Sequence, residues 1–62
     1  MMYVIKVGEF YVSDVNVVFG GFIESIELSK KLMRNFTKEG AERIAKTING
    51  TVVSMADVIT ND

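Results

Sequence analysis

The sequence predicts an α+β fold: a small curved antiparallel β-sheet of four to five strands, with one main helix at about residues 37–49 packed on one face. In the first half of the chain, apolar and polar residues alternate with a period of two, which is typical of half-buried strands. In the second half, one segment repeats its apolar residues at i, i+3, i+4 and i+7, the period of an amphipathic helix. A chain of 62 residues has room for one domain, so we expect residues 1–62 to form a single domain in the order β-β-β-β-α-β.

The first two strands are expected at residues 3–7 and 10–12, joined by Gly8-Glu9. A two-residue loop with glycine first favours a type II′ hairpin turn. This register places two apolar pairs on the inward face, Val7 with Phe10 and Ile5 with Val12.

The alternation then changes phase. The inward residues are even-numbered up to Val12, but the next apolar alternation falls on odd positions from Val15 onward. Because a shift of one residue exchanges the two faces of a strand, we expect a bulge or short break at Ser13-Asp14.

Gly20-Gly21 lies between two β-rich segments and predicts a second hairpin. A two-residue turn there gives the pairs Phe19–Phe22, Val17–Glu24 and Val15–Ile26, and it also sets Asp14 opposite Glu27. In this register Val18 and Ile23 lie on the face away from the helix.

Residues 29–35 favour one or two helical turns capped by Ser29, and residues 37–49 form the main helix. Thr37 is the expected N-cap, and Gly50 is expected at the left-handed position that ends the helix. Gly40, near the start of the main helix, is either a tolerated helix-weakening residue or allows the helix to approach the sheet closely.

Residues 51–55 are expected to form the last strand, returning directly from the helix. Residues 56–62 contain Val58 and Ile59, which are too apolar for a random tail. They could extend the last strand, dock as a flap or contact a second chain.

The composition argues against catalysis. The chain has no cysteine and no histidine, and its acidic residues form no recognisable catalytic or calcium-binding motif. We therefore expect a protein that is not an enzyme and has no cofactor and no bound metal. No basic and apolar leader and no long apolar segment is visible, which favours a cytoplasmic protein without a membrane partner.

The charges are unevenly distributed. Residues 1–29 have a net charge of −3, and residues 30–46 carry six basic against two acidic residues, a net charge of +4. One interpretation is a solvated helix surface with the i, i+4 pairs Glu39–Arg43 and Glu42–Lys46. The other is a basic patch that binds an acidic partner or phosphates, formed by Lys30, Lys31, Arg34 and Lys38.

The second hairpin provides another candidate surface. Four apolar residues surround its flexible turn: Val18, Phe19, Phe22 and Ile23. Either they mark a binding site, or a second layer of the fold covers them.

Several short motifs are distributed along the chain: Tyr3-Val4-Ile5-Lys6, Tyr11-Val12, Ser29-Lys30-Lys31, Phe36-Thr37, Ala41, Ile44-Ala45 and Gly50-Thr51-Val52-Val53. Together they resemble small phage and prophage proteins of low-GC Gram-positive bacteria. The chain departs from the pattern at Leu32-Met33, where alanine is usual, and at Asn49, which replaces a glycine. The resemblance implies an accessory protein that binds and inhibits a host protein, within the cytoplasm of an infected or lysogenic bacterium.

We therefore expect a non-enzymatic protein-binding module, encoded by a phage, that inhibits or modulates a host enzyme or defence complex. Its expected partner-binding residues are the apolar anchors Val18, Phe19, Phe22 and Ile23, with Lys30, Lys31, Arg34 and Lys38 for orientation and association rate. One alternative is an obligate homodimer, paired through a sheet edge or residues 56–62. Another is weak nucleic-acid binding through the basic residues 30–46, which the net charge of −1 disfavours.

Overall fold

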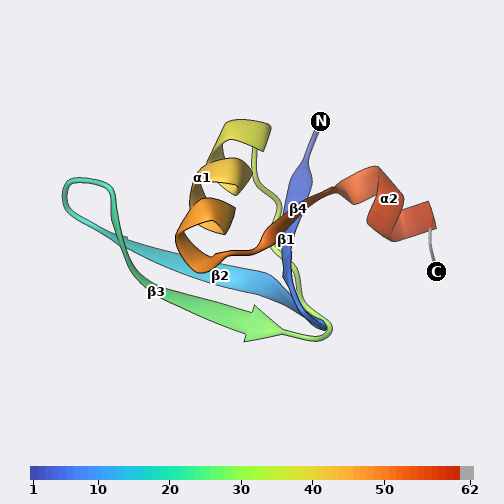
Figure 1. Ribbon diagram of the computed structural model, residues 1–62, viewed down its shortest axis with the longest axis horizontal. Coiled ribbons are helices and arrows are strands. Elements are labelled where there is room, and N and C mark those ends of the chain that lie inside the picture. Colours follow the sequence, from blue (N-terminus) through green and yellow to red (C-terminus); the bar gives the residue numbers. More distant parts are fainter. Residues whose placement is uncertain (61–62) are drawn as a thin grey trace.

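The computed structural model describes residues 1–60, which form a four-stranded antiparallel sheet and two helices (Figure 1). The elements are β1 (Tyr3–Val7), β2 (Phe10–Val18), β3 (Phe22–Ser29), α1 (Lys38–Ile48), β4 (Thr51–Ser54) and α2 (Met55–Thr60). The strands lie side by side in the order β3-β2-β1-β4, with α1 across one face. The predicted α+β class, antiparallel sheet and main helix are confirmed. The order differs from the expected β-β-β-β-α-β, because β2 continues through its bulge as one strand and α2 follows β4.

The β1–β2 turn forms as predicted. Val7 pairs with Phe10, and Gly8 has a φ of 62°. Ile5 and Val12 are fully buried, but Phe10 keeps 40% of its surface exposed. Its placement in the inward set was only partly right, because α1 packs against β1 and β4 and leaves this corner of the sheet uncovered.

The β2–β3 hairpin contains two bulges, one on each strand. The first is the predicted one: Val12 pairs with Leu28 and Asp14 with Glu27, so Ser13 is the extra residue. The second was not predicted, and it leaves Glu24 unpaired in the register. Each bulge moves the following residues to the other face of the strand.

The second bulge corrects the predicted pairing at the tip. Val18 pairs with Phe22 across a three-residue loop, and Val17 pairs with Ile23 rather than with Glu24. The pairs further from the tip, including Asp14 with Glu27, agree with the prediction. Ile23 therefore shares a face with Val17 toward α1 and is half-buried, whereas the sequence placed it outside.

Residues 29–35 are not helical, which contradicts the prediction for this segment. Ser29 does cap a turn, because its Oγ accepts hydrogen bonds from the backbone N–H groups of Lys31 and Leu32. The chain then runs extended beside β1 (Figure 1). Arg34 N–H donates to the carbonyl of Val12, and Phe36 exchanges two backbone hydrogen bonds of 2.8 Å with Tyr3.

This extended segment has a structural reason. The two paired positions of β1 and β2 are Lys6 with Tyr11 and Val7 with Phe10, after which the two strands separate. Backbone groups on both strands would otherwise lack partners, and an unpaired buried backbone group is strongly unfavourable. Satisfying them outweighs the weak helix preference of residues 29–35.

Helix α1 begins and ends close to the predicted positions. Thr37 is the N-cap, and its hydroxyl accepts a hydrogen bond of 3.2 Å from Gly40 N–H. The left-handed residue at the other end is Asn49, with a φ of 59°, and not Gly50 as expected. Gly40 does not approach the sheet: the atom that an added Cβ would meet within 4 Å is the Thr37 hydroxyl.

The main core lies between α1 and the sheet. Its buried members are Ile5, Val12, Ala41 and Ala45, surrounded by seven partly buried apolar residues. Alanines on the inner face of α1 let the helix lie close to the strands.

The other face of the sheet is covered in part by α2. Val4 is fully buried on that face and pairs with Val53. Val58 of α2 lines a shallow hollow there together with Lys6 and Tyr11. The last strand is one residue shorter than predicted, and residues 56–60 correspond to the docked-flap alternative; residues 61–62 lie outside the described part of the chain.

Candidate functional site

The β2–β3 hairpin reaches beyond α1 and forms one end of the molecule (Figure 1). The molecule measures 37 Å along its longest axis and 16 Å along its shortest. At the end of the hairpin, Gly20 and Gly21 have φ values of 95° and 84°, which favour glycine. The turn is closed by a hydrogen bond of 3.0 Å from Gly21 N–H to the carbonyl of Val18.

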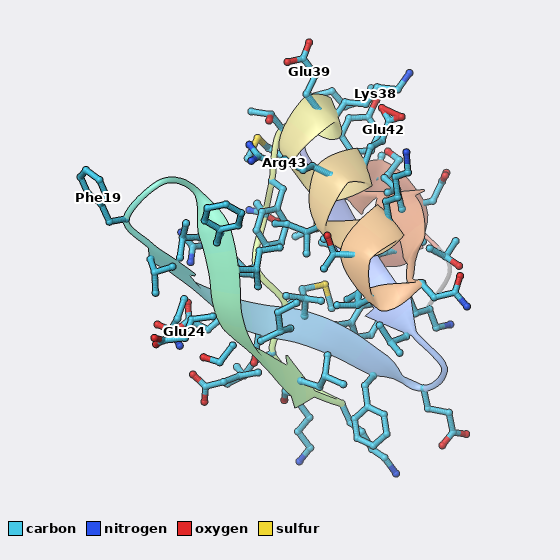
Figure 2. All side chains as sticks on the ribbon, turned by 60° about the vertical axis from the view of Figure 1, so that its left-hand side comes forward. Phe19, Glu24, Lys38, Glu39, Glu42 and Arg43 are labelled. Atoms are coloured by element: carbon cyan, nitrogen blue, oxygen red, sulfur yellow. The ribbon has the colours of Figure 1, made fainter. Side chains whose placement is uncertain are left out.

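Phe19 points outward from this turn, away from both helices (Figure 2). It is 103% exposed, as accessible as in an isolated extended peptide. Phe22 is 72% exposed and Val17 is 58% exposed, and Val18 is also exposed. We call these four residues the tip surface. Three of them were predicted as apolar anchors, and the fourth, Val17, was not among the predicted partner-binding residues.

The tip surface has a large capacity for apolar burial. Phenylalanine rings bury roughly 150–250 Å² each, and burial stabilises by about 25 cal/mol per Å². Covering Phe19 and Phe22 would therefore contribute on the order of 8 kcal/mol, before the unfavourable entropy of association. Within residues 1–60, Phe19 is fully exposed and Phe22 is only partly covered.

A groove separates the hairpin from α1. It consists of two adjoining hollows of about 200 and 270 Å³ that share Gly21, Ile23 and Arg43. We call it the tip groove; its remaining lining residues are Val17, Phe22, Gly40, Ile44 and Thr47. Residues 40, 43, 44 and 47 follow the i, i+3, i+4, i+7 spacing of one helix face, so the sequence contained a signal for this wall.

Arg43 is the residue of this site that the sequence analysis missed, because it was assigned to a surface pair with Glu39. In the structure the side chain of Arg43 points toward the hairpin, and Glu39 points away from it (Figure 2). A Cβ added to Gly21 would lie 3.4 Å from the Arg43 Nη2. Neither Glu39–Arg43 nor Glu42–Lys46 forms an ion pair within 4.0 Å in the described part of the chain.

The four predicted basic residues follow the extended segment and the start of α1, and they do not converge on the tip surface. Lys30 lies 4.0 Å from Glu9 and 5.6 Å from the ring centre of Phe10. Arg34 forms an ion pair of 2.9 Å with Asp14. Lys31 and Lys38 are exposed.

The described residues contain no cluster of three acidic side chains that could hold a metal ion. Neither of the two helices within residues 1–60 has the length and apolar character needed to cross a membrane. Over this part of the chain, no buried side-chain nitrogen or oxygen lacks a hydrogen-bond partner. Among the described residues, Phe19 and Phe22 of the tip surface are the most exposed aromatic side chains, and the tip groove adjoins them. No protein-family model, curated protein or solved structure matches the chain.

Proposed function

We propose that this chain is a non-enzymatic protein-binding module that attaches to its partner through the tip surface. The observation that supports the proposal is the full exposure of Phe19 at the end of a well-formed hairpin. Aromatic residues at a protruding position act as anchors when they enter a pocket of a partner. Exposed apolar patches of this kind often mark interaction sites.

The hairpin suits this role because its backbone is held on both sides of the loop. Hydrogen-bonded pairs continue to Val18 and Phe22, directly next to the turn. The Asn16 side chain also donates a hydrogen bond of 2.9 Å to the hydroxyl of Ser25. A pre-ordered anchor loses less conformational entropy on binding than a flexible one.

The partner that we propose is a bacterial host protein, an enzyme or a defence complex, which the chain would inhibit or modulate. The resemblance of its motifs to phage and prophage accessory proteins supports this proposal. Lys30, Lys31, Arg34 and Lys38 would then steer association through long-range charge rather than through contact at the tip surface.

The test is affinity capture by the tagged full chain from nuclease-treated lysate of a low-GC Gram-positive bacterium. Phe19→Ser is the test variant. Leu32→Ser is the matched control, because Leu32 is 69% exposed and lies outside the tip surface. We expect one protein to be retained by the native chain and by Leu32→Ser, and to be lost with Phe19→Ser. Equal retention by all three chains would contradict the proposal, and recovery of the chain alone would favour self-association.

A further inference from the structure

The tip groove contains a single charged side chain. Of the residues that line its two hollows, Arg43 alone is charged. No carboxylate lies within 4.0 Å of its guanidinium in the described part of the chain. Glu24, the acidic residue next to the hairpin tip, points away from the groove (Figure 2). The groove therefore presents one positive charge without a counter-ion.

The surroundings of Arg43 favour a specific kind of ligand group. A guanidinium offers five N–H donors in a planar fork that matches the two oxygens of a carboxylate. Val17, Ile23 and Ile44 provide apolar walls around it. Arg43 is itself exposed, so water would leave its charged hydrogen bonds only when a bound side chain packs against these walls. They also provide contact area for an aliphatic or aromatic side chain.

A second copy of this chain is a poor occupant. The loop that a second copy would insert, Phe19 to Gly21, carries no carboxylate. A second copy that inserts its own tip would therefore leave Arg43 without a counter-ion, whereas a partner protein can supply both an acidic and an apolar group.

We infer that the tip groove binds an acidic side chain of the partner protein, flanked by an apolar residue, with Arg43 as the group that recognises the carboxylate. The inference rests on the proposed protein-binding function and adds the chemistry of the partner. In the complex, the partner holds the tip surface while one of its Asp or Glu residues enters the tip groove. Arg43 then contributes selectivity as well as affinity.

The probe is a library of random twelve-residue peptides, selected on the immobilised full chain. The best peptide is then titrated by fluorescence polarisation against four chains: native, Arg43→Gln, Lys46→Gln and Phe19→Ser. Lys46→Gln is the matched control, because Lys46 is an exposed basic residue of α1 that does not line the groove. Circular dichroism of each variant checks that the fold is retained.

We expect the selected peptides to share Asp or Glu next to an apolar residue. Arg43→Gln should weaken binding by about 3- to 5-fold, and Lys46→Gln by less than twofold. Peptides without acidic enrichment, an absence of selected peptides, or equal binding by Arg43→Gln would overturn the inference. Loss with Phe19→Ser but not with Arg43→Gln would leave the proposed function intact. A labelled fifteen-nucleotide single strand that binds more tightly than the best peptide, and that loses binding with Arg43→Gln, would show that the groove binds nucleic acid instead.

Discussion

Gly50 lies directly against Ile5: a Cβ added to Gly50 would be 2.9 Å from the Cγ2 of Ile5. The same Cβ would lie 3.3 Å from the carbonyl oxygen of Lys6. Gly50 follows α1 and precedes β4, so this contact fixes how closely the connection passes over β1. Asn49 adopts the left-handed conformation that ends the helix, and Gly50 allows the close approach.

Gly50→Ala should destabilise the fold by about 1–3 kcal/mol, because Ile5 is fully buried and cannot move aside without disturbing the core. The change ordinarily stabilises a protein by about 0.4–1 kcal/mol through the unfolded state, and here the clash exceeds that gain. Urea denaturation followed by circular dichroism measures the difference. Gly40→Ala is the comparison, expected to stay within about 1 kcal/mol of the native chain since its added methyl meets only the Thr37 hydroxyl. A Gly50→Ala variant more stable than the native chain would show that the contact with Ile5 does not exclude a side chain at this position.

Thr37→Ala should lower the free energy of unfolding by about 1 kcal/mol, because it removes the acceptor for Gly40 N–H. Thr37→Ser retains the hydroxyl and should remain within a few tenths of a kcal/mol of the native chain. Thermal unfolding of the three proteins provides the measurement. Equal loss of stability in both variants would assign the effect to the threonine methyl group instead of the cap.

Local sequence signals predicted the elements that depend on local interactions. The Gly8 turn, the Ser13 bulge and the Thr37 cap each follow from neighbouring residues, and each is confirmed. The helical prediction for residues 29–35 was wrong because distant strands decide the conformation of this segment. Arg34 N–H bonds the carbonyl of Val12, and Phe36, directly after the segment, exchanges two hydrogen bonds with Tyr3. Pairing of that kind joins positions more than twenty residues apart and leaves no periodic pattern in the sequence.

The candidate site was predicted in part. Phe19 and Val18 were identified from the apolar residues around two glycines, and both are exposed. The alternation of β3 gives no sign of the bulge at Glu24. Without this bulge, the predicted register placed Ile23 on the wrong face. The tip groove depends on that face, which is why Arg43 was assigned to an ordinary surface pair.

Val18→Ser and Ile23→Ser should differ in stability as a consequence of that bulge. Val18 is exposed, so its replacement should change the free energy of unfolding by no more than about 0.5 kcal/mol. Ile23 is half-buried toward α1, so its replacement should destabilise the fold by about 1–2 kcal/mol. Chemical denaturation of both variants under one set of conditions makes the comparison. A larger loss of stability for Val18→Ser than for Ile23→Ser would instead support the register in which Val17 pairs with Glu24.

The two ion pairs of the extended segment should contribute unequally to the free energy of unfolding. Arg34 lies 2.9 Å from Asp14, which the strand register also places opposite Glu27, so the guanidinium offsets a like-charge pair. Both side chains are about half exposed, and a double-mutant cycle with Arg34→Gln and Asp14→Asn should give a coupling of roughly 0.2–1 kcal/mol. The control cycle removes Lys30 and Glu9, which are 4.0 Å apart and more exposed, and should give no measurable coupling. The first coupling should also decline in high salt, because the Debye length falls to about 3 Å at 1 M. No measurable coupling in the first cycle would mean that Arg34 does not hold the extended segment to β2 through charge, and that its backbone hydrogen bond to Val12 is sufficient.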